Sequence, residues 1–381
     1  MATLHHLIPA DAPHQLGERL ARVGAGFGAQ DLARSAGADF DTLPLMARGQ
    51  RLADAMAQHL PPDFAQAAPL LVASMGQPMG LDAKGEPVAA GDVPSGFFYL
   101  PHSLFIAQHG LNHLDLAIQA QHALTQRFTA EFSLRPFLQA HPQATLAHLG
   151  RWAQDPNAHV RRAASEATRP RLPWATRLSD FVRDPSPCLP LLEALRDDPS
   201  AYVRRSVANH LNDIGKDHPE RLLGIAARWL DPAPAARVAL VRHALRSLVK
   251  QTHPQALALL GHGQLSALQV QSSQVEPRRP RIGGSVRLRV VLHNSSTELA
   301  TALVDWRVHY TKADGRSSPK VFKGSTVRVL PGAQQVLEKT WSLRQMSTRT
   351  HHPGIHAVEV LINGQAHDVG AFELLTPDWP R

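Results

Sequence analysis

The sequence predicts a multidomain protein in which an all-α, HEAT-like solenoid precedes an all-β, immunoglobulin-like sandwich. Three observations support this fold class. Up to about residue 265, Leu-, Ala- and Arg-rich segments of helical length are separated by Pro, Gly and Asp-Pro. A motif recurs within this region. Beyond it, Val, Thr, Ser and Gly become more frequent and apolar residues alternate with polar ones. We therefore expect a helical domain at 1–265 and a sandwich at 268–381.

The repeated motif runs from His-Pro through Arg-Trp to Asp-Pro, and it is clearest within 141–255. HPQATLAHLGRWAQDPNAHVRR aligns with HPERLLGIAARWLDPAPAARVA after one gap, and between them lies LPLLEALRDDPSAYVRRSVANHL. An Asp can cap a helix whose first residue is Pro, so each Asp-Pro indicates the start of a helix. Two helices per repeat, at a period of roughly 35–45 residues, are typical of a HEAT-like solenoid. An irregular helical bundle with recurring turns remains the alternative.

Seven segments of the C-terminal part alternate as β-strands do. They lie at 268–277, 285–294, 302–311, 326–330, 334–343, 355–364 and 367–375. About seven short strands in about 110 residues are typical of an immunoglobulin-like sandwich. The chain has one cysteine, Cys188, so no disulfide can join the two sheets and the hydrophobic core must hold them together.

The bulk composition favours a globular protein of the cytoplasm. Of the 381 residues, 43% are hydrophobic, and no apolar run approaches the length that crosses a bilayer. The N-terminus lacks the basic start and apolar block of a secretory signal. A single cysteine does not require an oxidising compartment. We therefore expect a cytoplasmic protein that does not contact a membrane.

The positive charge is unevenly distributed along the chain. The net charge is +8, yet residues 1–150 carry four more acidic than basic residues, whereas 151–255 and 256–381 each carry six more basic ones. Arg greatly outnumbers Lys, and the planar guanidinium group suits phosphate. The charge therefore favours a polyanionic partner, although a basic surface that only keeps the protein soluble remains the alternative.

The 22 histidines raise the possibility of a metal site. His109 and His113 are four residues apart, as are His352 and His356. A metallopeptidase helix would place Glu directly after the first His, and this chain has Gly110 there. Phosphate-binding loops, dinucleotide-binding glycine patterns and Cys-His zinc spacings are also missing. We therefore expect neither a metal nor a cofactor.

The second helices of two adjacent repeats, in NAHVRRAASEA and SAYVRRSVANHLNDIGKDHP, are offset by 43 residues. Under this offset Arg162 corresponds to Arg205. Glu166 corresponds to Asn209, and Asp213 follows one helical turn later on the same stripe. Second helices stack side by side in a solenoid, so one surface would carry arginines, an amide and two carboxylates. Because carboxylates repel phosphate, they must either pair with the arginines or meet a positive centre.

Two long motifs, VRRAASEATRPRLPW and YVRRSVANHLNDIGKDHP, resemble the AlkC family of bacterial DNA alkylation-repair glycosylases, which are HEAT-like proteins related to the AlkD group. The core likeness covers about 130–255, and AlkC-type proteins with a C-terminal Ig-like domain would match nearly the whole chain. The first 100 residues contribute little to it. The resemblance implies a monofunctional, cofactor-free and monomeric enzyme. It would remove positively charged N-alkylated bases, such as 3-methyladenine and 3-methylcytosine, from duplex DNA.

The resemblance also implies site residues. The family positions that carry activity match Glu166 and Asp213, the aromatic matches Trp174, and a further acid matches Glu131 less distinctively. Departure of a cationic base leaves an oxocarbenium-like sugar, so carboxylates would stabilise the sugar and position water. Trp174 would offer a π face to a cation. The residues expected to bind DNA, mainly through its phosphates, are Arg161, Arg162, Arg169, Arg204, Arg205, Asn209 and Lys216.

Each carboxylate also has a local interpretation, in which Glu166 pairs with Arg162, Asp213 with Lys216, and Glu131 with an arginine of its own helix. Two other functions also remain open. The protein could be a non-catalytic, DNA-binding damage sensor that keeps the arginines but releases no base. It could also be a HEAT scaffold whose basic face meets an acidic protein.

Overall fold

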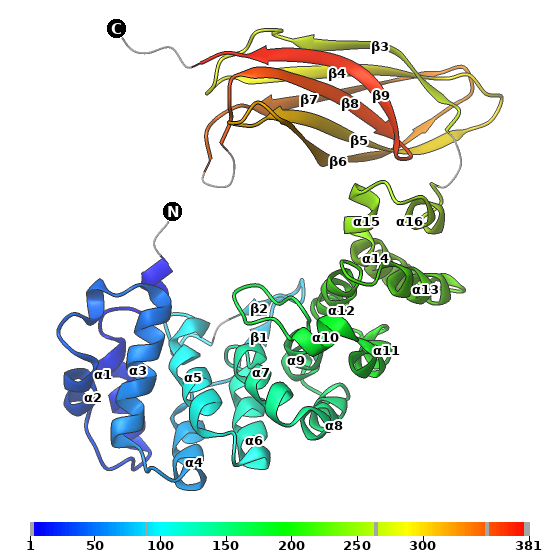
Figure 1. The fold of residues 1–381 in the computed structure, drawn as a ribbon. Helices are drawn as coiled ribbons and strands as arrows, with labels where there is room; N and C mark the ends of the chain where they lie inside the picture. The colour runs from blue at the N-terminus through cyan, green and yellow to red at the C-terminus, as the bar shows by residue number, and fades with distance from the viewer. Residues whose placement is uncertain (1–3, 89, 263–265, 347–349, 377–381) are drawn as a thin grey trace, which may run out of the picture. The chain divides into compact units, whose positions relative to one another are not determined.

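The computed structural model describes residues 4–88, 90–262, 266–346 and 350–376. In these ranges helices occupy the chain up to α16 and an all-β domain follows, so the predicted fold class is confirmed (Figure 1). The chain forms two compact units, Met1–Leu222 with Pro232–Ala244, and Leu223–Asp231 with Leu245–Arg381. None of the described helices is both long enough and apolar enough to cross a membrane.

The helices are short and are separated by the predicted Pro- and Gly-rich turns. Their bounds are α1 Ala12–Arg22, α2 Ala29–Ala36, α3 Leu45–His59, α4 Phe64–Ser74, α5 Leu100–His109, α6 Leu114–Thr125, α7 Glu131–Ala140, α8 Pro142–Trp152, α9 Ala158–Ala167, α10 Ser179–Arg183, α11 Leu189–Leu195, α12 Ala201–Ile214, α13 Pro219–Leu230, α14 Ala235–Ala244, α15 Arg246–Lys250 and α16 Pro254–Leu259. The described residues also form four 3₁₀ turns, η1 Leu4–Leu7, η2 Phe40–Thr42, η3 Gly96–Tyr99 and η4 Ser186–Cys188.

Within the first unit the helices pack in two rows, as a solenoid requires (Figure 1). In one row, called the inner row here, α3, α5, α7, α9, α12 and α14 each pack against the next. The other row contains α4, α6, α8 and α11. The apolar faces of α1 to α7 enclose a continuous core that includes the fully buried Leu52, Met56 and Phe98. The buried Cys188 is a packed thiol at the start of α11, and burial raises its pKa.

The recurring Asp-Pro turns are held by a recurring arginine. In each turn, the arginine six residues after the Asp donates its Nη1 hydrogens to backbone carbonyls of the turn. The pairs are Arg161 with Asp155 and Pro156, both at 2.9 Å, Arg204 with Asp198 at 2.5 Å and Pro199 at 2.9 Å, and Arg237 with Pro232 at 3.2 Å. These carbonyls belong to the connection between two helices, where they lack helical partners, so the arginine satisfies them.

The Gly- and Pro-rich segment 76–96 contains a small hairpin of β1 Gly80–Leu81 and β2 Pro87–Val88. The Asp82 side chain closes its turn by accepting hydrogen bonds from the backbone N–H groups of Lys84 and Glu86, at 2.8 and 2.9 Å. Such Asx turns favour a tight reversal. Because each strand has only two residues, periodicity could not reveal it.

The C-terminal domain has seven strands among its described residues, arranged as two antiparallel sheets (Figure 1). The bounds are β3 Leu268–Glu276, β4 Ser285–Asn294, β5 Ala300–Thr311, β6 Ser317–Val329, β7 Gln334–Ser342, β8 Gly354–Ile362 and β9 Gln365–Leu374. One sheet has the order β3-β4-β7 and the other β6-β5-β8-β9. Alternate residues of both sheets enclose a core that contains Trp306 and Trp341, whose ring centroids lie 6.0 Å apart.

Local sequence explains two features of the sandwich. Asn363 and Gly364 have φ of +47° and +84°, which is the Asn-Gly turn that joins two strands with the correct twist. Strand β6 begins at Ser317, well before the predicted 326–330. It lies at the edge of its sheet and pairs in register only with β5, so its first half carries polar residues and shows little alternation.

The predicted domain division, between residues 265 and 268, directly follows residues 263–265, which lie outside the described residues, and it stays a prediction. Within the second unit the last helices pack against strands. A Cβ atom added to Gly364, in the β8–β9 turn, would approach within 2.6 Å of Leu257 in α16. This contact adds a reason for glycine at the turn besides its positive φ.

Candidate active site

The two carboxylates predicted to be catalytic meet at one arginine. Glu166 lies at the end of α9 and Asp213 near the end of α12. Both residues are buried, with 5% of Glu166 and 1% of Asp213 exposed to solvent. Arg169, in the first turn after α9, donates Nη1 to Oε1 of Glu166 at 2.5 Å and Nε to Oδ2 of Asp213 at 2.8 Å. The predicted packing of α9 against α12 therefore brings together two acids that are 47 positions apart in the sequence.

Glu166 is buried, and it has a full set of donors. Ser206 of α12 donates its hydroxyl to Oε2 at 2.6 Å, and Nη2 of Arg162 lies 3.6 Å from Oε1. Burial raises the pKa of Glu166, but the charges of Arg162 and Arg169 and the Ser206 hydrogen bond lower it, and the net direction is downward. Glu166 is therefore held ionised, as a group that stabilises a cation must be.

Asp213 has a partner on each side of its carboxylate. Besides Arg169, Lys216 donates Nζ to Oδ1 at 2.7 Å. The Lys216 side chain is 45% exposed, whereas that of Asp213 is 2% exposed. Lys216 therefore reaches from solvent to a buried acid, and it can both pair with Asp213 and face an anion at the surface.

Glu131 begins α7 and forms a second ion pair beside the first. Its Oε2 accepts a hydrogen bond from Nη1 of Arg162 at 2.5 Å and another from the Thr129 hydroxyl. The Arg162 guanidinium also lies over the Tyr202 ring, 5.4 Å from its centroid. Burial lowers the pKa of Arg162, but the negative charges of Glu131 and Glu166 raise it by more, so the net shift is upward. Arg162 therefore links both glutamates.

Trp174 is an exposed aromatic residue near the site, whereas most tryptophans are largely buried. Its side chain is 71% exposed, and its φ of +63° places a bulky residue in the left-handed region. A non-glycine residue keeps this strained backbone conformation only where the surrounding structure imposes it, and such residues are common at functional sites. Beside it lies a cavity of about 220 Å³, whose lining includes Phe97 and Phe132.

The residues expected to bind DNA fall into groups. The guanidinium groups of Arg161 and Arg204 brace Asp-Pro turns, and Arg161 also pairs with Asp198 at 2.6 Å. The phosphate contacts expected of these two arginines stay predictions. Arg162 and Arg169 are occupied by the carboxylates of the site. Arg205, with a side chain 49% exposed, pairs with Glu86 of the β1–β2 hairpin. Oδ1 of Asn209 accepts a hydrogen bond from Nε2 of His243 at 3.0 Å.

Sequence reasoning missed three residues near the site, namely Ser206, Tyr202 and Thr129, and it offered Arg135 only as a possible partner of Glu131. Ser206 lies one turn before His210 and faces α9, and its hydroxyl contacts a carboxylate that is 40 positions away. The 43-residue offset could have directed attention to it, because a Ser stands where the first repeat has Ala163. The other contacts depend on packing between helices.

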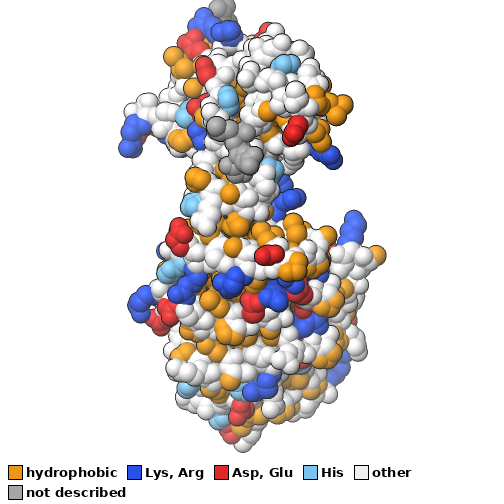
Figure 2. Space-filling model, turned by 90° about the vertical axis from the view of Figure 1, so that its right-hand side faces the viewer, with side chains coloured by type: hydrophobic (Ala, Val, Ile, Leu, Met, Phe, Trp, Pro, Cys, Tyr) orange, Lys and Arg blue, Asp and Glu red, His pale blue; other side chains and the backbone are white. Residues whose placement is uncertain are grey.

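Many charged side chains elsewhere among the described residues take part in ion pairs. Figure 2 shows Lys and Arg side chains lying next to Asp and Glu side chains across the face that it draws. Partly exposed pairs include Arg171 with Asp217 at 2.6 Å and Arg237 with Asp197 at 2.5 Å. Such pairs reduce the positive potential, so only arginines and lysines with exposed donors can serve a polyanion.

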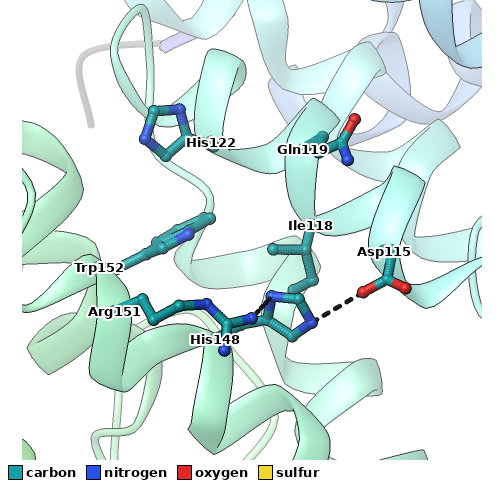
Figure 3. A pocket seen from close by; sticks show the side chains of 7 residues that line it. All are labelled: Asp115, Ile118, Gln119, His122, His148, Arg151 and Trp152. Carbon is teal, nitrogen blue, oxygen red and sulfur yellow. Dashed lines mark hydrogen bonds and ion pairs between the residues drawn. The ribbon is translucent and has the colours of Figure 1, made fainter.

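A larger cavity, of about 510 Å³, lies between α6 and α8 of the other row (Figure 3). Its polar groups satisfy one another, because Nε2 of His148 lies 3.0 Å from Asp115 and Nδ1 of His148 lies 2.6 Å from Arg151. It contains none of the predicted site residues. In the described ranges no three His, Cys, Asp or Glu side chains come together as a metal site would require.

Comparison with known proteins agrees with a helical repair-protein domain that is followed by an Ig-like domain. Residues 125–247 match the family described as DNA alkylation repair enzyme, and residues 269–376 match the C-terminal Ig-like domain of uncharacterised protein YhaZ. Protein YhaZ of Bacillus subtilis is 37% identical over 270 residues, which cover 71% of this chain and 75% of that protein. A solved structure of the alkylpurine DNA glycosylase AlkC from Pseudomonas fluorescens, bound to DNA containing an abasic site analog, has a TM-score of 0.89, with 34% identity over 98% of this chain and 99% of that one.

The helical domain matches the DNA alkylation repair enzyme family and is followed by a domain that matches the Ig-like domain of YhaZ, so the chain is of the DNA alkylation-repair class. Within this class the chain belongs to the AlkC family. The resemblance seen in the two sequence motifs is thereby confirmed.

Proposed function

We propose that this protein is a monofunctional DNA glycosylase that removes cationic alkylated bases, of the 3-methyladenine and 3-methylcytosine type, from duplex DNA. The observation that carries the proposal is the buried pair Glu166 and Asp213, shared by Arg169 and accompanied by the exposed Trp174. The similarity to a structure of an alkylpurine DNA glycosylase supports it.

The chemistry requires little acid catalysis, because an alkylated base already carries a positive charge. Cleavage of the N-glycosidic bond sends the bonding electrons to the base, which leaves neutral, and the sugar becomes an oxocarbenium-like cation. Water then adds at C1′ and loses a proton. An ionised Glu166 stabilises the cation, and Asp213 or Glu166 orients the water and accepts its proton. Trp174 presents its π face to a cation.

DNA phosphates would be bound by the exposed basic side chains near this site, mainly Arg205 and Lys216. Arg205 is paired with Glu86, and Lys216 with Asp213. Because the side chains of Arg205 and Glu86 are both exposed, a DNA phosphate would compete with Glu86 for Arg205. We further propose that the protein acts as a monomer in the cytoplasm, on the nucleoid. Glu131 orients the guanidinium of Arg162, whose positive charge helps to keep Glu166 ionised.

Incubation with methylated duplex DNA, scored by release of free methylated bases, tests the proposal. Wild type should release both bases. Glu166→Gln and Asp213→Asn should each reduce the single-turnover rate by about 10²-fold or more, as loss of one charge-stabilising group does. Glu220→Gln, at an exposed position of α13, is the matched control and should retain the wild-type rate.

The outcomes separate the three functions. Binding of methylated DNA without base release by wild type would indicate a damage sensor. Absence of both binding and release would indicate a protein scaffold. Full activity of both site variants would remove the catalytic assignment while leaving the enzyme.

A further inference from the structure

Arg135 on α7 forms an unusual set of contacts for a buried arginine. It is 3% exposed, and all its recorded hydrogen bonds go to backbone carbonyls. Nη1 donates to Ala167 at 3.1 Å and to Arg169 at 2.9 Å, and Nε donates to Thr176 at 2.6 Å. The first two carbonyls lie where α9 ends and the third lies close to the start of α10. One guanidinium therefore joins the two ends of segment 167–176.

This segment carries both Arg169, which holds the carboxylates, and Trp174. It has little regular structure of its own, since its internal backbone hydrogen bonds are long, such as Ala175 N–H to Leu172 at 3.4 Å. Trp174 has an unfavourable φ and an exposed ring, so an untethered segment would relax to a different conformation.

Trp174 forms part of the wall of a cavity of about 220 Å³, so a relaxed segment has room to turn the exposed ring further into it. The other walls include Phe97, Leu104 and Phe132, together with Arg135 itself. Burial of an exposed indole ring in an apolar cavity is favourable, by about 25 cal/mol per Å² of apolar surface. The exposed ring position therefore needs a restraint, and the three Arg135 hydrogen bonds are one.

Burial of an arginine without a carboxylate partner is costly, which argues that this arrangement serves more than packing. Burial, and then the charge of Arg169, lower the pKa of Arg135 to about 10, so it remains protonated at neutral pH. Its Nη2 has no hydrogen-bond partner among the described residues. A methionine of similar length would fill the space at less cost, but it could not hold three carbonyls.

We propose that Arg135 is a positioning residue, which fixes segment 167–176 so that Trp174 stays exposed at a set distance from the carboxylates bridged by Arg169. The role in catalysis rests on the proposed glycosylase function, whereas the restraint of the segment does not. Arg135 contacts the backbone of the segment and acts by holding it in place.

Hydrogen exchange without DNA tests the restraint directly. Arg135→Lys keeps the charge but loses the planar fork, so it cannot bond both ends of the segment. We expect amide exchange in 170–178 to accelerate about tenfold or more, while exchange in α12 changes less than about twofold. Arg183→Lys, at an exposed position of α10, is the matched control and should leave exchange unchanged. Arg135→Met is the second variant should the lysine variant fold poorly, as judged by its thermal unfolding midpoint.

Excision kinetics test the positioning role. Arg135→Lys should reduce the single-turnover rate at saturating methylated DNA about tenfold, with DNA affinity within about twofold of wild type. In a Trp174→Ala background, the same substitution should reduce the rate by no more than about twofold, because it acts through Trp174.

Two results would overturn the proposal. One is unchanged exchange in 170–178, which removes the restraint whatever the enzyme does. The other is a rate loss that is fully additive with Trp174→Ala, which assigns Arg135 to general stability. If wild type releases no base, the glycosylase proposal fails by itself, and the exchange measurement still decides whether Arg135 restrains the segment.

Discussion

Glu166 and Asp213 accept hydrogen bonds from opposite sides of the same guanidinium, that of Arg169, at 2.5 and 2.8 Å. Two buried carboxylates repel each other unless a cation lies between them. Arg169 bridges the two acids, and its charge is one of the causes that lower the pKa of Glu166. The site thus presents negative charge to a substrate that carries a positive one, although the surrounding surface is rich in arginine.

Removal of Arg169 should therefore destabilise the protein more than removal of a neighbouring arginine. Arg169→Met leaves two buried carboxylates with one guanidinium fewer, and we expect the free energy of unfolding to fall by about 3–5 kcal/mol. Arg171→Met is the matched control, because its pair with Asp217 is about one quarter exposed and should contribute about 1 kcal/mol or less. Urea unfolding of the two variants measures the difference, and equal losses would contradict the central role of Arg169.

Ser206 should set the acid limb of the excision profile. Its hydrogen bond is one of the causes that lower the pKa of Glu166 below the ordinary 4.5, so the ionised form persists as pH falls through that value. In Ser206→Ala this cause is lost and the pKa rises, so activity should begin to fall at a higher pH. Ser165→Ala is the control, since Ser165 lies 3.0 Å from the Ser206 hydroxyl but has no recorded bond to Glu166. Overlapping pH–rate profiles would refute the prediction.

Arg204 and Arg205 are neighbours in the sequence with different expected roles. Arg204 braces the Asp198-Pro199 turn, so Arg204→Ala should lower the unfolding midpoint and leave the salt dependence of DNA binding unchanged. Arg205 is exposed, and Arg205→Ala should reduce the slope of log K against log salt by about 1, with little change in stability. Binding isotherms at several salt concentrations distinguish the two, and a reversed outcome would assign the phosphate contact to Arg204.

His210 should make stability depend on pH. It is fully buried, Nδ1–H donates to the Ser165 carbonyl at 2.9 Å, and burial lowers its pKa from 6.5 to about 4. The unfolded chain therefore binds a proton between these values and the folded protein does not. Stability from the neutral ring is present above pH 6.5 and is lost as pH falls towards 4, by about 2 kcal/mol between pH 7 and pH 5.

The difference between wild type and His210→Gln isolates this effect. Unfolding of the variant should depend less on pH over that interval, whereas the exposed control His14→Gln should match wild type. If wild type and His210→Gln lose stability equally from pH 7 to pH 5, His210 is not the titrating group.

Local patterns in the chain were sufficient for the architecture. Asp-Pro turns, helical segments, strand alternation and the Asn363-Gly364 turn act over a few residues, so they can be recognised without knowledge of the packing. They predicted helices followed by an immunoglobulin-like sandwich, and the two long motifs identified the family and pointed to Glu166 and Asp213. Where the local pattern is weak, as in the polar edge strand β6 and the short β1–β2 hairpin, the prediction fell short.

Partners across helices could not be obtained in this way. That Arg169 bridges two acids, that Ser206 contacts Glu166, and that Arg135 joins both ends of the Trp174 segment depend on which helix faces meet in the solenoid. Arginines of one repeated motif therefore diverge, with Arg204 turned to backbone carbonyls and Arg205 to an exposed carboxylate. Periodicity specifies the face on which a side chain lies, whereas its burial and its partner follow from contacts between segments distant in the chain.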